Sequence, residues 1–159
     1  MTLAWAELGV REGAGKTNNP RVVDYYKDAG HKEVKEDETP WCAAYVGAML
    51  YRASIQPNGS LGARSYERWG IKLRNPVYGC IGVKTRARGP LWAGHVGFVV
   101  AANRQQVWLL AGNQGDAVSV AAYPRELFTA WVWPSEFPVE SGPLPMAYYQ
   151  PALTNASEA

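Results

Sequence analysis

The pattern of apolar and polar positions changes character about halfway along the chain. In the first half, apolar residues recur at three- and four-residue intervals, which is the spacing of one face of a helix. In the second half, short runs rich in valine and tryptophan are separated by turn residues, which is typical of strands. This order predicts an α+β fold in which N-terminal helices pack on a C-terminal antiparallel β-sheet.

Four helices are expected in the first half. The first should turn Leu3, Trp5 and Leu8 inward, and the second should run from Asn19–Pro20 to a stop at Gly30. Together the expected helices cover residues 2–9, 19–30, 40–53 and 62–69. Five strands are expected in the second half, over residues 80–85, 95–102, 106–112, 117–122 and 127–133.

The chain is interpreted as one domain over residues 1–134, followed by a proline-rich tail over residues 135–159. Prolines recur throughout this tail, so an extended conformation is expected, with disorder over residues 155–159. A length of 159 residues is enough for one domain with a sizeable core.

Charge and hydropathy exclude several classes of function. The net charge of +2 gives no case for nucleic-acid binding, although it would not repel the protein from an anionic cell wall. No segment approaches the roughly 18 apolar residues that a membrane span requires. Glu7 and Arg11 interrupt any apolar stretch near the start, so no signal peptide is expected. We therefore expect a monomer that is made in a cytoplasm and does not insert into membranes.

Cys42 is the main candidate for a catalytic residue. Thr39 can cap a helix and Pro40 fits the first helical position, which would make Cys42 about the third helical residue. There the unpaired N–H groups and the helix dipole should favour the thiolate, which is the nucleophilic form. The alternative interpretation is a buried core cysteine. Cys80 lies in an apolar run and is expected to be core, and a reducing cytosol argues against a disulfide between the two.

A catalytic thiol needs a base, and the chain has two histidines. His31 lies in a polar run typical of a solvated loop, whereas His95 opens a strong strand beside a glycine. If residues 103–105 form a three-residue loop, Ala102 faces Gln106 and Asn113 lies opposite His95, where it can orient the imidazole. A four-residue loop would place Gln114 there instead, and Asn113 also fits a turn before Gly115.

The blocks Thr39–Val46, Gly94–Val99 and Ala111–Gln114 resemble the CHAP and NlpC/P60-type cysteine peptidases and amidases, most closely a compact phage-associated branch. The resemblance extends over residues 3–134. It implies a papain-like α+β fold and cleavage of amide bonds in bacterial peptidoglycan. By position, Cys42 matches the nucleophile, His95 the base and Asn113 the polar third residue.

The resemblance also bears on the surroundings of these three residues. Trp41 and Trp92 flank the catalytic blocks and are expected to bind substrate with Gln114, although core packing is an equal alternative for the two indoles. Many CHAP members have a Glu where this chain has Ala111. No cofactor or metal is expected, because the adjacent acidic residues 36–38 lack the alternating spacing of calcium ligands. They are expected instead to place negative charge near the start of the Cys42 helix.

The expected function is that of a phage endolysin, a peptidoglycan hydrolase that reaches the cell wall or periplasm once the host membrane is breached. An exported antibacterial effector would use the same chemistry. An acyl transferase, with an amine in place of water, and a non-catalytic wall-binding module remain alternatives. The bond that is cut is either the N-acetylmuramoyl–L-alanine amide or a bond within the stem or cross-bridge.

Overall fold

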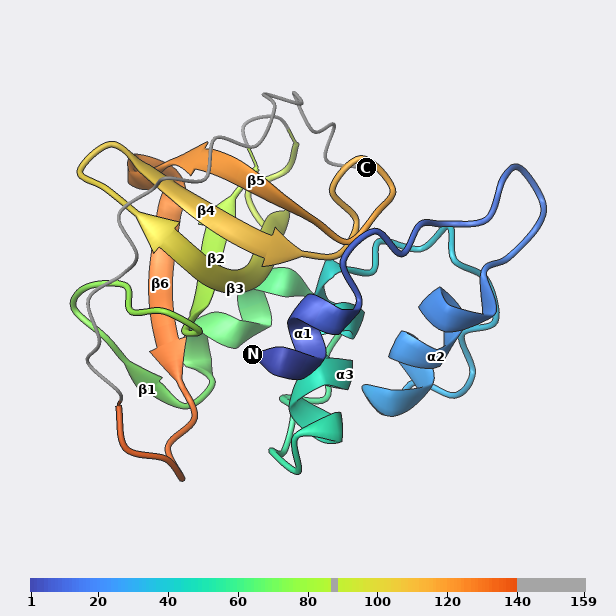
Figure 1. Ribbon diagram of the computed structural model, residues 1–159, viewed down its shortest axis with the longest axis horizontal. Helices are drawn as coiled ribbons and strands as arrows, with labels where there is room; N and C mark the ends of the chain where they lie inside the picture. The colour runs from blue at the N-terminus through green and yellow to red at the C-terminus, as the bar shows by residue number, and fades with distance from the viewer. Residues whose placement is uncertain (87–88, 140–159) are drawn as a thin grey trace.

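The computed structural model describes residues 1–86 and 89–139, and most of the expected C-terminal tail, including residues 155–159, lies outside these ranges. The described chain has an α+β fold (Figure 1). The helices are α1 (Thr2–Ala6), α2 (Pro20–Asp28) and α3 (Cys42–Arg52), with 3-10 helices η1 (Ala63–Arg68) and η2 (Arg125–Leu127). The strands are β1 (Ile71–Lys72), β2 (Ile81–Thr85), β3 (Gly94–Ala102), β4 (Gln106–Ala111), β5 (Ser119–Pro124) and β6 (Phe128–Trp133).

The six strands form one antiparallel sheet in the order β1-β6-β2-β3-β4-β5. Helix α3 packs between α2 and β3, as Figure 1 shows. The expectation of N-terminal helices on an antiparallel sheet is therefore confirmed. The short edge strand β1 was not expected, because two residues are too few to produce a periodic pattern.

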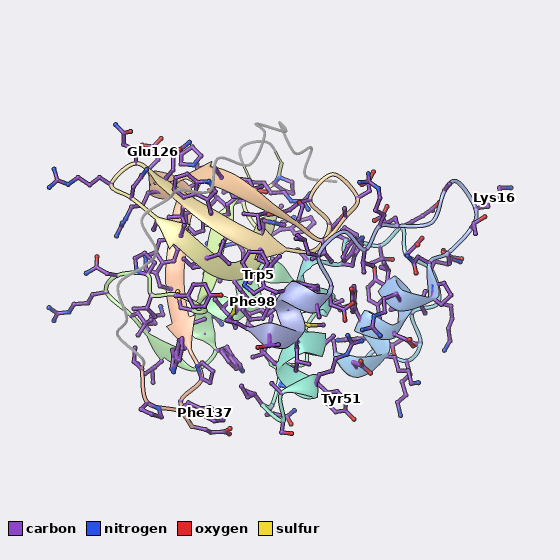
Figure 2. The ribbon with its side chains drawn as sticks, viewed as in Figure 1. Trp5, Lys16, Tyr51, Phe98, Glu126 and Phe137 are labelled. Atoms are coloured by element: carbon purple, nitrogen blue, oxygen red, sulfur yellow. The ribbon has the colours of Figure 1, made fainter. Side chains whose placement is uncertain are left out.

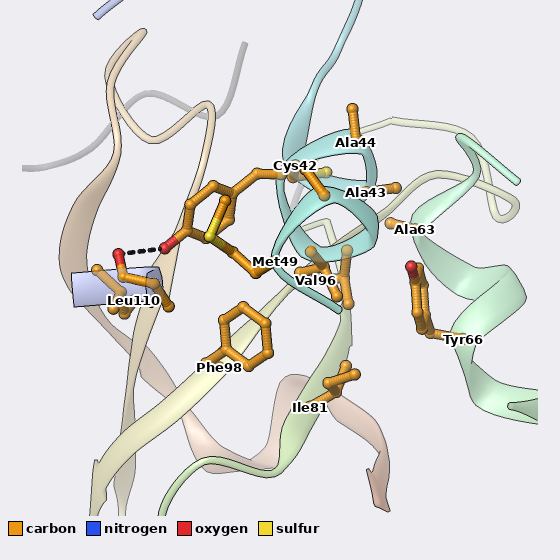
Figure 3. Packing of buried hydrophobic residues seen from close by; sticks show 14 of the residues in the cluster. Cys42, Ala43, Ala44, Met49, Ala63, Tyr66, Ile81, Val96, Phe98 and Leu110 are labelled. Carbon is orange, nitrogen blue, oxygen red and sulfur yellow. Dashed lines mark hydrogen bonds between the residues drawn. The ribbon is translucent and has the colours of Figure 1, made fainter. Parts of the chain in front are cut away.

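The core has two parts, because successive residues of a strand point to opposite faces of the sheet. Phe98 and Leu110 belong to the larger cluster between the sheet and the helices, which Figure 3 shows from close by. Val99 and Leu109 belong to the smaller cluster, which also contains Cys80, as expected. In Figure 2, Phe98 lies in the middle of the molecule, whereas the side chains of exposed residues such as Lys16 project from it.

The start of α3 differs from the expectation. The helix begins at Cys42, and its N-cap Trp41 makes no side-chain capping bond. The carbonyl oxygen of Thr39 instead accepts a hydrogen bond from the hydroxyl of Tyr26. Thr39 is therefore engaged with α2 through its backbone, and Pro40 precedes the helix. In α2, by contrast, the Asn19 side chain accepts from the Arg21 N–H at 2.8 Å, as its sequence indicated.

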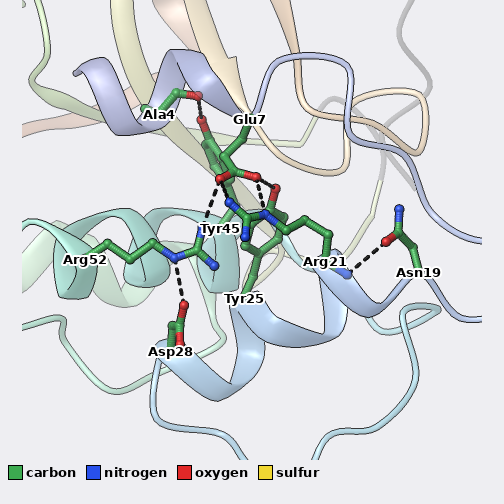
Figure 4. A network of polar contacts seen from close by, with 8 residues as sticks. All are labelled: Ala4, Glu7, Asn19, Arg21, Tyr25, Asp28, Tyr45 and Arg52. Carbon is green, nitrogen blue, oxygen red and sulfur yellow. Dashed lines mark hydrogen bonds and ion pairs between the residues drawn. The ribbon is translucent and has the colours of Figure 1, made fainter.

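The buried face of α1 also differs from the expectation. Leu3 and Leu8 are 43% and 47% exposed, whereas Ala4 and Glu7 are buried. Figure 4 shows the reason: the Glu7 carboxylate accepts hydrogen bonds from Arg21, Arg52 and Tyr25. These three partners allow the carboxylate to be buried. Of the three residues expected to point inward, Trp5 packs against the core, whereas Leu3 and Leu8 are exposed.

The β3–β4 hairpin turns at residues 103–105, but its register near the loop is shifted by one residue. Ala102 pairs with Val107 rather than with Gln106. A bulge between Val99 and Ala101 then returns the strands to the expected register, with Val99 opposite Leu109. Strand β4 ends at Ala111, so the chain leaves the sheet before Asn113 can pair with His95.

Candidate active site

The thiol of Cys42 lies at the start of α3 and is almost fully enclosed, with 3% of the residue exposed. Burial raises the pKa of this thiol above its ordinary value. Other groups lower the pKa of the thiol, but by less than burial raises it. They are the backbone N–H of Val96, the charge of Arg86 and the backbone N–H groups of Ala43 and Cys42. The expectation of a thiol with a lowered pKa is therefore wrong for this arrangement, because desolvation outweighs the helix terminus.

The contact with Val96 brings Cys42 to the start of β3, because Val96 directly follows His95 in the chain. Figure 3 shows Cys42 on the first turn of α3, and Val96 among the core side chains beneath that helix. Two residues separated by more than fifty positions are thus neighbours in the fold.

The imidazole of His95 is bound by the side chain of Gln114. Its Nε2 atom lies 3.0 Å from Oε1 of Gln114, and the Tyr123 hydroxyl donates to the same oxygen at 3.0 Å. The Gln114 Nε2 group donates to the Ser119 carbonyl oxygen at 2.7 Å, and this fixes which end of the amide faces His95. Because an amide oxygen can only accept, Nε2 of His95 carries a hydrogen, and Nδ1 is the basic nitrogen of the neutral ring.

The structure thus gives the orienting position to Gln114 and not to Asn113, which was the first choice from the sequence. Asn113 has a positive φ of 59° at the exit from β4, and its buried Oδ1 atom has no hydrogen-bond partner among the described residues. The chain turns there instead of continuing along β3. This turn brings the next residue, Gln114, to the imidazole.

The thiol and the imidazole are directed to different faces of β3. Val96 belongs to the same core cluster as Cys42, whereas the ring of His95 packs 5.7 Å from the ring of Tyr123, which belongs to the other cluster. Among the described residues, the hydrogen bond of the imidazole is to Gln114 and not to Cys42. The two groups are neighbours through adjacent residues of one strand, and no direct bond links them.

Two cationic side chains surround this pair. Lys84 pairs with His95 across β2 and β3, is fully buried, and holds its ammonium 4.3 Å from the centroid of the Tyr123 ring. Arg86 donates from Nε to the Gly94 carbonyl oxygen at 3.3 Å, and its charge lowers the pKa of Cys42.

The two tryptophans expected to bind substrate differ in position. Trp41 is fully buried, stacks on Tyr25 at 5.8 Å and donates from its indole nitrogen to Glu12. Trp41 therefore packs in the core. Trp92 is 80% exposed in the loop before β3, where a ligand can reach it.

Of the acidic residues 36–38, Asp37 is buried and binds the loop before α2. Its Oδ2 atom accepts from the backbone N–H groups of Gly13 and Asn19, both at 2.7 Å. Within residues 1–86 and 89–139, no group of three His, Cys, Asp or Glu side chains is placed to hold a metal ion.

Four residues of the site were not singled out from the sequence: Lys84, Arg86, Ser119 and Tyr123. A lysine inside the otherwise apolar run of β2 was a usable signal, because lysine is rarely buried without a specific partner. Tyr123 lies beyond the expected end of its strand. Ser119 and Arg86 had no distinguishing pattern.

An apolar cavity of about 510 Å³ lies away from this site, at the other end of α3. It is lined by side chains from α1, the C-terminal turn of α3 and the sheet, among them Met49, Leu50 and Phe98. The polar cluster and this apolar cavity are therefore separate features.

Comparisons with protein-family models, with curated proteins and with solved structures found no match for this chain. None of the described helices combines the length and apolarity that a membrane crossing demands. The case for a function therefore rests on the site itself.

Proposed function

We propose that the protein is a peptidoglycan hydrolase that cleaves an amide bond of the bacterial wall peptide with Cys42 as nucleophile and His95 as base. The observation that carries the proposal is the junction of α3 and β3, where the thiol contacts the backbone beside His95, whose Nε2–H is oriented by Gln114. The proposal includes a papain-like arrangement of the α+β fold, with a thiol at a helix start facing a histidine strand.

The reaction follows from the assigned tautomer. Nδ1 of His95 accepts the Cys42 proton, the thiolate attacks the amide carbonyl, and a carbon–sulfur bond forms. The imidazolium protonates the leaving amine as the carbon–nitrogen bond breaks, and water then hydrolyses the thioester to a carboxylic acid and restores the thiol. The backbone N–H of Cys42, in the first turn of α3, is a donor for the oxyanion.

The proposal requires a movement of side chains before proton transfer, because the imidazole is directed away from the thiol. Val96 brings the backbone of β3 to Cys42, but His95 points to the opposite face of the strand, so the movement has to include the start of β3. The same movement has to open the site to a wall peptide, because Cys42 is almost fully enclosed. The protein would act as an endolysin or as an exported effector, at the cell wall in either case.

Digestion of purified peptidoglycan tests the proposal, with fragments identified by mass spectrometry. We expect Cys42→Ala and His95→Ala to abolish the release of fragments. Cys80→Ala and His31→Ala are the matched controls and should retain it. A Cys42→Ala protein that digests peptidoglycan at the normal rate would refute the nucleophile.

Burial of Cys42 favours a second candidate, a non-catalytic wall-binding module. The two are separated by the pH dependence of Cys42 alkylation. An isolated buried thiol reacts only at alkaline pH, because its pKa is raised. A thiol that forms an ion pair with His95 also reacts near neutral pH, and this neutral component should disappear in His95→Ala.

A further inference from the structure

Asn113 presents a hydrogen-bond acceptor that the fold leaves unused. The residue is 2% exposed, and its Oδ1 atom is buried without a hydrogen-bond partner among the described residues. Most buried polar side-chain atoms in proteins are paired, because a buried acceptor without a donor loses its bonds to water without replacement. Within residues 1–86 and 89–139, the two other unpaired buried side-chain atoms are on His31 and Tyr66, and neither residue is next to one that bonds His95.

Its two neighbours in the chain connect Asn113 to the candidate site. The preceding residue, Gly112, lies so close to Trp41 that an added Cβ would be 2.5 Å from the indole ring. Trp41 is the N-cap of α3 and precedes Cys42. The following residue, Gln114, holds His95. Asn113 therefore joins a segment packed against the start of the nucleophile helix to the residue that orients the base.

Backbone geometry does not account for the unpaired oxygen. The φ of 59° at Asn113 lies in the left-handed region, where Asn is tolerated better than most residues. Glycine would satisfy the same backbone, as Gly115 does at 61° in the same turn. The turn therefore explains a small residue at this position, but it does not explain a buried amide oxygen.

The partner of this oxygen has to be an N–H or O–H donor, because an amide oxygen can only accept. A peptide substrate carries a neutral N–H group next to each carbonyl that Cys42 could attack. The proposed reaction therefore supplies a donor of the required kind.

We propose that Oδ1 of Asn113 accepts a hydrogen bond from a backbone amide N–H of the wall peptide, on the acyl side of the scissile bond. This inference rests on the proposed function and makes Asn113 a substrate-binding residue, with Gln114 as the residue that orients His95. The bond fixes the position of the peptide so that its carbonyl faces Cys42.

The test measures binding without turnover, in a Cys42→Ala background. The ligand is a soluble disaccharide-peptide released from peptidoglycan, and its Kd is measured by calorimetry. Asn113→Gly keeps the backbone conformation and removes the acceptor, so it should weaken binding about tenfold. Asp116→Gly is the matched control, because Asp116 is exposed in the same turn with φ 57°. It should bind as tightly as the background protein.

A second ligand, N-methylated at the amide on the acyl side, identifies the donor. Its Kd for the Cys42→Ala background should be about tenfold higher than that of the unmethylated ligand. Adding Asn113→Gly should not raise this Kd further. An unchanged Kd for Asn113→Gly, equal losses in both proteins on N-methylation, or no binding by the background protein would each overturn the inference.

Activity of the single variant separates this inference from the proposed function. Asn113→Gly in the active protein should raise KM with little change in kcat, and Cys42 should be alkylated at the normal rate. If Asn113 acts only on the fold or on His95, kcat and the alkylation rate fall instead, and the inference is wrong. If Cys42→Ala still digests peptidoglycan, the proposed function fails, whatever Asn113→Gly does.

Discussion

The Nε2 atom of His95 lies 3.0 Å from Oε1 of Gln114, nineteen residues further along the chain. The bond determines the tautomer of the imidazole, because the other end of the Gln114 amide is held by the Ser119 carbonyl oxygen. It therefore sets which nitrogen can accept a proton. The chemistry available to His95 depends on a residue that itself cannot titrate.

The tautomer can be observed directly. We expect neutral His95 to carry its hydrogen on Nε2, as judged by nitrogen-15 NMR of the side chain, with His31→Ala used to leave a single histidine signal. In Gln114→Ala the ring should populate both tautomers, and peptidoglycan digestion should fall about tenfold to a hundredfold. A wild-type signal with the hydrogen on Nδ1 would contradict the assignment.

The buried Glu7 carboxylate should contribute strongly to stability. Breaking a buried ion pair on one side costs about 3 kcal/mol or more, so Glu7→Gln should lower the free energy of unfolding in urea by about that amount at pH 7. The exposed Glu126→Gln is the control and should change it by less than about 0.5 kcal/mol.

The contribution of Glu7 should depend on pH in a defined direction. Burial raises the pKa of Glu7, but the hydrogen bonds from Arg21 and Tyr25 and the charges of Arg21 and Arg52 hold it below 4.5. The stabilisation is present above pH 4.5 and is lost as the pH falls through the lower folded value. The difference between wild type and Glu7→Gln should shrink with acidification. A constant difference would contradict this account.

Cys80 should make the fold sensitive to alkali. Burial raises the pKa of its thiol from 9.0 to about 12. Below pH 9 the thiol is neutral in both states, whereas above pH 9 the unfolded chain ionises first, so stability is lost as the pH rises toward 12. Between pH 8 and pH 10.5 this group should remove about 2 kcal/mol from the free energy of unfolding.

Cys80→Ala isolates this contribution, because its own effect on packing cancels when one variant is compared at two pH values. Between pH 8 and pH 10.5, the free energy of unfolding of the variant should fall by about 2 kcal/mol less than that of wild type. Buried tyrosines such as Tyr25, whose pKa is also raised, act equally in both proteins. Identical pH dependences would show that the Cys80 thiol ionises as easily folded as unfolded.

Trp92 should act on substrate and not on the fold. Because its side chain is exposed, Trp92→Ala should leave the unfolding free energy within about 0.5 kcal/mol of wild type. If the indole packs on the wall peptide, KM should rise about threefold to tenfold. Tyr51→Ala is the control, because Tyr51 is an exposed aromatic at the far end of α3. An equal rise in KM for both variants would show that Trp92 does not bind the substrate specifically.

The sequence by itself determined the three α-helices, five of the six described strands and the loop of the hairpin, because these depend on local periodicity and on turn residues. Asn19 and Gly30 mark the ends of α2 as expected, and residues 103–105 form the loop of the hairpin. Local signals also selected Cys42 and His95, since one lies at a helix start and the other at a strand start.

Only the tertiary structure decided how the side chains of the site are used. The desolvation that raises the pKa of Cys42 comes from packing against segments distant in the chain. The choice of Gln114 over Asn113 depends on where β4 ends and on a left-handed turn, and a shift of one residue exchanges their positions. These outcomes are sums of many long-range contacts, which no local pattern encodes.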